Sequence, residues 1–221
     1  MHQPDRYYVP TDMVGTAEGA RIGVSWLVLH ASDWTGEPLI VVANDDRARW
    51  SERVVSDALR FRYVSDVAFR SAPAQGWRGG PTVLFSPPSV SVLAWFDRSR
   101  LVPALCVVQG RRYDTTAWAR AHGPVDLTTG LPYPPGPRVD PAVEQALTAL
   151  RDSMGGSSMS TSRDVAEAVR TLQTLAAEGH PIDPGDLESW ALANGWSLVG
   201  AHRLAVQASH VLAGDRSDAG R

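Results

Sequence analysis

The sequence predicts an α/β protein whose mostly parallel sheet is flanked by helices and followed by a small all-α unit. Short apolar runs alternate with amphipathic helical patterns up to about residue 130. A proline-rich stretch and a Gly/Ser stretch interrupt this alternation, and only helical patterns follow them. The expected parts are an α/β domain at 14–130, a connector with one helix at 131–161, a three-helix unit at 162–213 and a disordered tail at 214–221.

In the α/β domain, the apolar spacing and the turn residues between the runs define the elements. β-branched runs predict strands at 39–43, 82–85 and 104–108, and a looser alternation predicts one at 61–67. Helices are expected at 16–30, 47–59, 88–96 and 114–122. This order is typical of a Rossmann-like sheet with right-handed crossovers. Trp77, in a glycine-rich loop, either packs back onto the sheet or is exposed for a partner.

The C-terminal helices are marked by capping residues at both ends. Asp140 and Pro141 begin the connector helix, and Asp183 and Pro184 begin the second helix of the all-α unit. That helix ends at Gly195, and Ser197 is the expected cap of the next one. The remaining helix of the unit is expected at 162–178.

Composition limits the classes of function. All 21 basic residues are arginine, as in proteins from high-GC, and above all actinobacterial, genomes. The net charge is −3, and the acidic surplus lies entirely after residue 150, which disfavours a nucleic-acid partner. The single cysteine, Cys106, excludes an intrachain disulfide, and no apolar run is long enough to span a membrane. We therefore expect a cytoplasmic protein.

Polar residues that follow the predicted strands are the candidate ligand site, because ligands of parallel sheets bind outside the carboxyl ends of the strands. These candidates are Asn44, Asp45, Asp46, Ser86, Arg111 and Arg112. Asp45 and Asp46 have the chemistry to hold a divalent metal, and Arg111 with Arg112 that to hold an anion. The first βα turn is expected at 44–47, where it contains no glycine, and the absence of lysine excludes Schiff-base chemistry. No cofactor, no metal and no catalytic residue is predicted.

The last two helices resemble a helix-turn-helix, with Ala191 in the first helix, Gly195 in the turn and Ala201 at a later apolar position, as this motif requires. In a DNA complex, His202, Arg203 and Gln207 would face the major groove. Between 163 and 212, however, 3 arginines stand against 6 acidic residues, so we expect this unit to contact a protein partner or a second copy of the chain.

The strand Ala-Leu-Cys-Val-Val at 104–108, the segment 118–129 (WARAHGPVDLTT) and the segment 190–196 (WALANGW) together resemble an uncharacterised actinobacterial family. That family joins an α/β unit to a short helical tail and has no established activity, so the resemblance implies the architecture alone. The function predicted is that of a non-catalytic interaction or regulatory protein that acts through its helical unit. The alternatives are a DNA-binding regulator and a metal-dependent, nuclease-like enzyme that uses Asp45 and Asp46.

Overall fold

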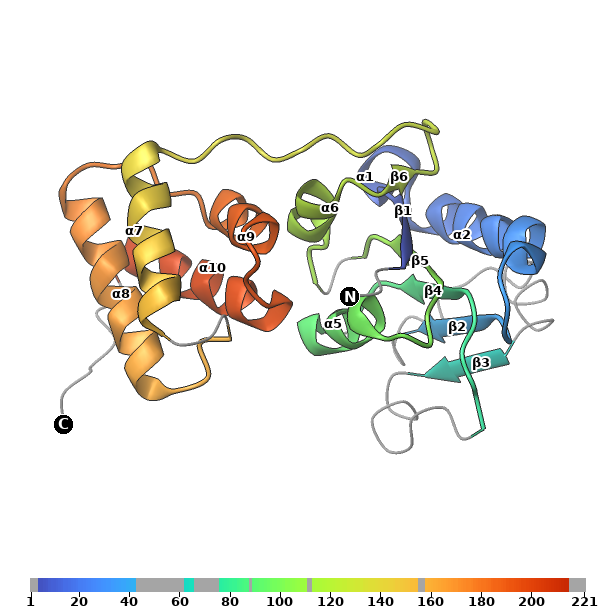
Figure 1. Ribbon diagram of the computed structural model, residues 1–221. Coiled ribbons are helices and arrows are strands. Elements are labelled where there is room, and N and C mark those ends of the chain that lie inside the picture. Colours follow the sequence, from blue (N-terminus) through green and yellow to red (C-terminus); the bar gives the residue numbers. More distant parts are fainter. Residues whose placement is uncertain are drawn as a thin grey trace. The chain divides into compact units, whose positions relative to one another are not determined.

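The computed structural model (Figure 1) describes residues 4–42, 62–65, 76–87, 89–110, 113–154 and 158–214. Contacts divide the chain into two compact units. The α/β unit contains residues 1–119 and 123–133, and the helical unit contains residues 120–122 and 134–221. The expected tail therefore lies, except for Gly214, outside the described residues.

In its described part, the α/β unit is built on an all-parallel sheet with the strand order β3-β2-β4-β5-β1-β6. The strands are β1 (Asp5–Val9), β2 (Leu39–Val42), β3 (Arg62–Ser65), β4 (Thr82–Phe85), β5 (Ala104–Val108) and β6 (Val125–Asp126). The strands β2, β4 and β5 are buried along their whole length, as the apolar runs predict for a sheet covered on both faces. The predicted α/β fold class with a mostly parallel sheet is confirmed.

Strand β1 is the element that the sequence pattern misses. It pairs in parallel with β5 on one side and with β6 on the other, so it is not an edge strand. The first βα connection is therefore 10–15, and the assignment of this role to 44–47 is wrong. The true first connection ends at Gly15, whose φ of 78° is a left-handed conformation that suits glycine.

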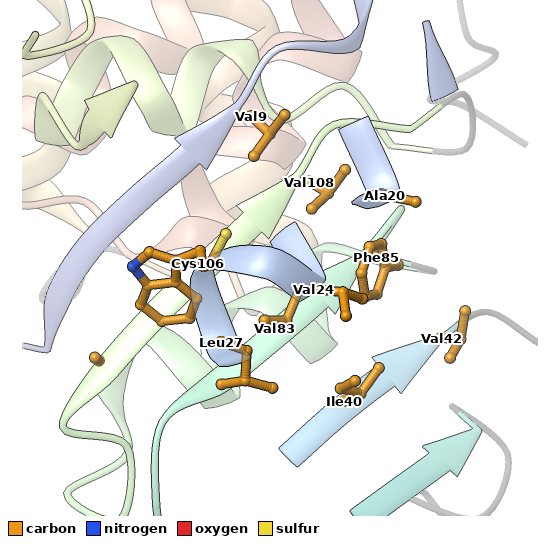
Figure 2. Packing of buried hydrophobic residues seen from close by; sticks show 12 residues of the cluster. Val9, Ala20, Val24, Leu27, Ile40, Val42, Val83, Phe85, Cys106 and Val108 are labelled. Atoms are coloured by element: carbon orange, nitrogen blue, oxygen red, sulfur yellow. The ribbon is translucent and has the colours of Figure 1, made fainter. Parts of the chain in front are cut away.

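Helix α2 covers one face of the sheet. After the short helix α1 (Thr11–Val14), α2 (Thr16–His30) buries Val24 and Leu27 against the side chains of β1, β4 and β5, as Figure 2 shows. The helix lies close to the strands because Gly23 has no side chain, and a Cβ there would lie 2.7 Å from Cγ2 of Val108. A short 3-10 turn, η1 (Ala31–Asp33), follows α2.

Helices α5 (Val90–Arg98) and α6 (Thr116–His122) belong to the opposite face, which carries Arg6 and Tyr8 of β1. Nε of Arg6 donates to Oδ1 of Asp97 on α5 at 2.8 Å, and Nε1 of Trp118 on α6 donates to the same oxygen at 3.2 Å. Trp77 is 8% exposed and donates to the carbonyl of Glu37, so it packs into the unit. A largely buried ion pair thus joins β1 to α5, and the hydrogen bond from Trp118 joins α6 to the same carboxylate.

The helical unit contains α7 (Pro141–Ser153), α8 (Ser162–Ala177), α9 (Pro184–Ala193) and α10 (Leu198–Leu212). Their N-caps are those that the sequence marks: the side chains of Asp140, Asp183 and Ser197 each accept a backbone N–H of their own helix. Helix α7 packs on α8, and contacts assign it to this unit, which therefore has four helices in its described part. The sequence pattern places α7 in the connector because the proline-rich and Gly/Ser stretches flank it.

Two arginines hold the loops of the helical unit. Arg203 on α10 donates to the carbonyl of Met159 at 2.7 Å, and Arg151 on α7 donates to the carbonyl of Asn194 at 2.7 Å. Met159 is 1% exposed and has a φ of 47°, a backbone angle that is unusual for a residue other than glycine. None of the helices in the described parts of the chain has the length and apolar content that crossing a bilayer requires.

Candidate ligand site at the carboxyl ends of the strands

The three strands β1, β4 and β5 end at the same level of the sheet. Val9 is paired with Val108, and Val108 is paired with Phe85, so the loops that follow these residues begin side by side. The backbone N–H of Gln109 donates to the carbonyl of Val9 at 3.0 Å, and that of Ser86 donates to the carbonyl of Val108 at 2.9 Å. The loops after β1, β4 and β5 therefore meet at one edge.

This edge contains a topological switch point between β1 and β5. The chain leaves β1 toward α2 on one face of the sheet, and it leaves β5 toward α6 on the other face. Places where neighbouring connections leave for opposite faces are typical ligand-binding positions of open parallel sheets.

Gln109 spans that switch point. Its Oε1 accepts the backbone N–H of Thr11 at 2.9 Å, and its Nε2 donates to Oγ1 of Thr116 at 3.3 Å. One amide group thereby fixes the start of α1, after β1, relative to the start of α6, after β5. The amide thus uses both its acceptor and its donor at this edge.

Ser86 and Gly110 make the tightest contact at the edge. Ser86 is 8% exposed and has a φ of 45°, a conformation that costs a residue other than glycine about 1 kcal/mol or more. A Cβ added to Gly110 would lie 1.9 Å from Oγ of Ser86, so no other residue fits at position 110 without a shift. Strain of this kind is often found where a loop is shaped for a function.

The hydroxyl groups of Tyr8 and Thr115 lie next to each other in the interior, near the start of α6. The hydroxyl of Tyr8 lies 3.2 Å from Oγ1 of Thr115, which is fully buried. Burial raises the pKa of Tyr8 far above its usual value, so the phenol stays neutral. Asp114 accepts the backbone N–H of Thr116 at 2.9 Å, and thereby supports the start of α6.

Of the residues that the sequence places in the ligand site, Ser86 is the one that the structure describes. It lies directly after β4, as predicted, and against Gly110. Asn44, Asp45, Asp46, Arg111 and Arg112 lie outside the described residues. Sequence reasoning misses Thr11 because it misses β1. The sequence points to the loop that holds Gln109 only through its charged residues Arg111 and Arg112, because charge is the stronger signal in a sequence.

The residues of the alternative DNA site lie on α10 and contact their own unit. Arg203 donates to the carbonyls of Met159 and Ser158, and Nδ1 of His202 lies 3.3 Å from Oε1 of Glu188 on α9. Gln207 is half-buried. Arg203 and His202 thus make contacts within the helical unit, and they would have to give up these contacts to bind a DNA base.

The described edge is chemically suited to hydrogen bonding with a neutral or polar ligand. Its side chains include hydroxyl and amide groups, which both donate and accept, together with the carboxylate of Asp114. Within the described residues, no group of three or more His, Cys, Asp or Glu side chains is placed to hold a metal ion.

The fold and this edge define an α/β protein with a helical C-terminal unit. Residues 139–221, which include α7 to α10, match a family model described as a domain of unknown function (DUF1889). This match is consistent with the uncharacterised family that the sequence resembles, and it concerns the helical unit. Comparison with curated proteins gave no match.

Proposed function

We propose that this is a cytoplasmic regulatory protein whose α/β unit binds a small polar ligand at the switch point between β1 and β5, and whose helical unit contacts a protein partner. The observation that carries the first part is the bridge made by Gln109 between Thr11 and Thr116. A ligand that replaces either hydrogen bond moves the start of α1 relative to the start of α6. Binding is thereby coupled to the conformation of the unit, which is what a regulatory role requires.

The ligand expected there is small and uncharged or weakly charged, with both donors and acceptors. Oγ of Ser86, the amide of Gln109 and the hydroxyl of Thr116 supply that chemistry. A strained Ser86 against a glycine supports this proposal further, because the pair brings two loop backbones close together at the edge. We propose binding without a chemical step.

The test is a thermal-shift screen of the full chain against amino acids, monosaccharides and nucleosides. A ligand at one hundred times its Kd adds about 2.7 kcal/mol of stability, and the proposal predicts such a rise for at least one class. The rise is lost in Gln109→Ala and kept in Gln145→Ala, which alters an exposed glutamine of α7. A hit that Gln109→Ala leaves unchanged contradicts the proposed place of binding.

The second part rests on the helical unit. Its apolar stripes are used in its own core, where Leu147, Leu172 and Leu204 are buried. Between 134 and 214 the sequence holds 5 arginines and 9 acidic residues, so the outer surface favours a basic protein surface as its partner. A second copy of the chain carries the same charge and is the less favourable partner.

Light scattering after size exclusion separates these partners. The proposal predicts a monomer at low and at moderate salt, together with a complex with a basic partner that weakens as salt rises. Reversal of charge in the exposed pair Glu144→Lys, Asp152→Lys should abolish the complex without unfolding the unit. A stable dimer that survives this double change identifies a second copy as the partner and contradicts the proposal of a basic one.

A DNA-binding role is the second candidate, because α9 and α10 are joined through the left-handed Gly195, with a φ of 82°. It requires Arg203 and His202 to leave their contacts within the unit. A shift assay over a salt series compares the full chain with an Arg203→Ala, Gln207→Ala variant. Binding that is equal in the two proteins, or absent from both, removes this candidate.

A further inference from the structure

We propose that the α/β unit has a second binding site, for a methylated organic ammonium ion, formed by the rings of Tyr7 and Trp34 and the carboxylates of Asp5 and Asp33. This site is independent of the proposed ligand site. It belongs to the face of the sheet that α2 covers, whereas the switch-point cluster lies beyond the carboxyl ends of the strands.

Three aromatic rings meet in this region. The ring centroids of Tyr7 and Trp34 are 6.1 Å apart with their planes at 73°, and Trp26 packs behind both rings at 4.9 and 5.5 Å. Trp26 is 4% exposed, whereas Tyr7 and Trp34 are half-buried. Trp26 therefore fixes the two outer rings, and those two rings are accessible to a ligand. A cation in the angle that the two nearly perpendicular ring planes form can lie within about 6 Å of both centroids, which is the range of a cation–π interaction.

Two carboxylates give this region a negative potential. Oδ2 of Asp5 accepts a hydrogen bond from Nε1 of Trp34 at 3.4 Å, and Oδ2 of Asp33 lies 2.8 Å from Nδ1 of His30. Burial raises the pKa of the Tyr7 phenol, and Asp5 and Asp33 raise it further, so both carboxylates act at the ring. Both acids are exposed, and a cation at the rings gains from their charge without forcing them out of water.

The chemistry favours a methylated ammonium over a primary amine. In each carboxylate the structure already engages one oxygen, with Trp34 or with His30, and ring faces accept a hydrogen bond only weakly. A quaternary ammonium has no N–H group to satisfy and spreads its charge over methyl groups that pack on rings. Choline is a probe of suitable size for two rings and two acids.

The experiment is an NMR titration of the full chain, followed through the indole N–H signals of its tryptophans. We expect choline to shift the signal of Trp34 in a saturable way. Its neutral isostere 3,3-dimethylbutan-1-ol should bind at least about threefold more weakly, because it lacks the charge on which the cation–π interaction depends. N-acetylarginine amide tests the alternative that the cation belongs to a peptide.

Matched variants assign the site. Trp34→Leu and the double change Asp5→Asn, Asp33→Asn should each weaken choline binding at least about threefold. Trp95→Leu alters a tryptophan with 37% exposure on α5 and should leave the affinity unchanged. The double change concerns exposed side chains, so it tests the proposal even where Trp34→Leu fails to fold. Equal binding of choline and its isostere, an equal loss in Trp95→Leu, or tighter binding of the arginine amide overturns the proposal.

Discussion

Substitution of Gly110 by alanine is a sharp test of the edge at which β4 and β5 end. The added Cβ would lie 1.9 Å from Oγ, 2.1 Å from Cβ and 2.5 Å from Cα of Ser86. A rotation of the Ser86 side chain moves only Oγ, so the contacts with Cβ and Cα remain. The two loop backbones must therefore separate, which weakens the hydrogen bond from Ser86 N–H to the carbonyl of Val108.

The expected loss is at the upper end of the range for overpacked sites, about 3 kcal/mol. In a unit of this size each kcal/mol lowers Tm by about 4 °C, so the midpoint should fall by about 12 °C. Ser86→Gly alone should change stability by less than about 1 kcal/mol, because glycine adopts the φ of 45° without strain. Combined with Gly110→Ala, it removes two of the three close contacts and should restore about half of the loss.

The assay is urea unfolding of the full chain, followed by the fluorescence of the buried tryptophans Trp26, Trp77 and Trp118 of the α/β unit. Gly185→Ala is the control, since its nearest neighbour is Oδ1 of Asp183 at 3.3 Å and alanine favours a helix. A loss below about 1 kcal/mol for Gly110→Ala, or an equal loss in the presence of Ser86→Gly, refutes the packing described at this edge.

Three further outcomes are expected from the described contacts. Asp97→Ala leaves Arg6 and Trp118 without their shared acceptor and should cost about 3 kcal/mol in urea unfolding, whereas a joint Arg6→Met, Asp97→Leu change should cost less than that single change. In the helical unit, Met159→Ala should lower the free energy of unfolding, measured by urea unfolding, by about 2 kcal/mol. An unchanged urea midpoint would show that Met159 is not packed as described. Burial raises the pKa of the Cys106 thiol far above its usual value, so iodoacetamide at pH 8 should label it after unfolding and not before; rapid labelling of the native protein would contradict this.

The sequence predicts best those elements whose ends are encoded locally. Asp140-Pro141, Asp183-Pro184 and Ser197 each place a capping oxygen and a helix start within a few residues, and the observed helices begin where these residues predict. The runs 39–42, 82–85 and 104–108 are strands for a similarly local reason, because a strand buried on both faces is almost entirely apolar, with Thr82 the one polar residue in these three runs.

Strand β1 is missed because what buries it is not local. Arg6 is the second residue of the strand and resembles a surface residue in the sequence, yet it is paired with Asp97, 91 positions away. With β1 absent from the prediction, the switch point between β1 and β5 has no place in it, and neither has the contact of Thr11 with Gln109. The candidate site is found in part from the loop composition, and its geometry depends on a pairing that no short pattern encodes.

Hydrogen–deuterium exchange on the full chain, with and without a compound that raises its Tm, tests most directly whether the switch point between β1 and β5 binds the ligand. The proposal predicts added protection in the segments 10–16 and 109–116, which Gln109 joins, and loss of that protection in Gln109→Ala. Protection confined to other segments, or retained in Gln109→Ala, would contradict it.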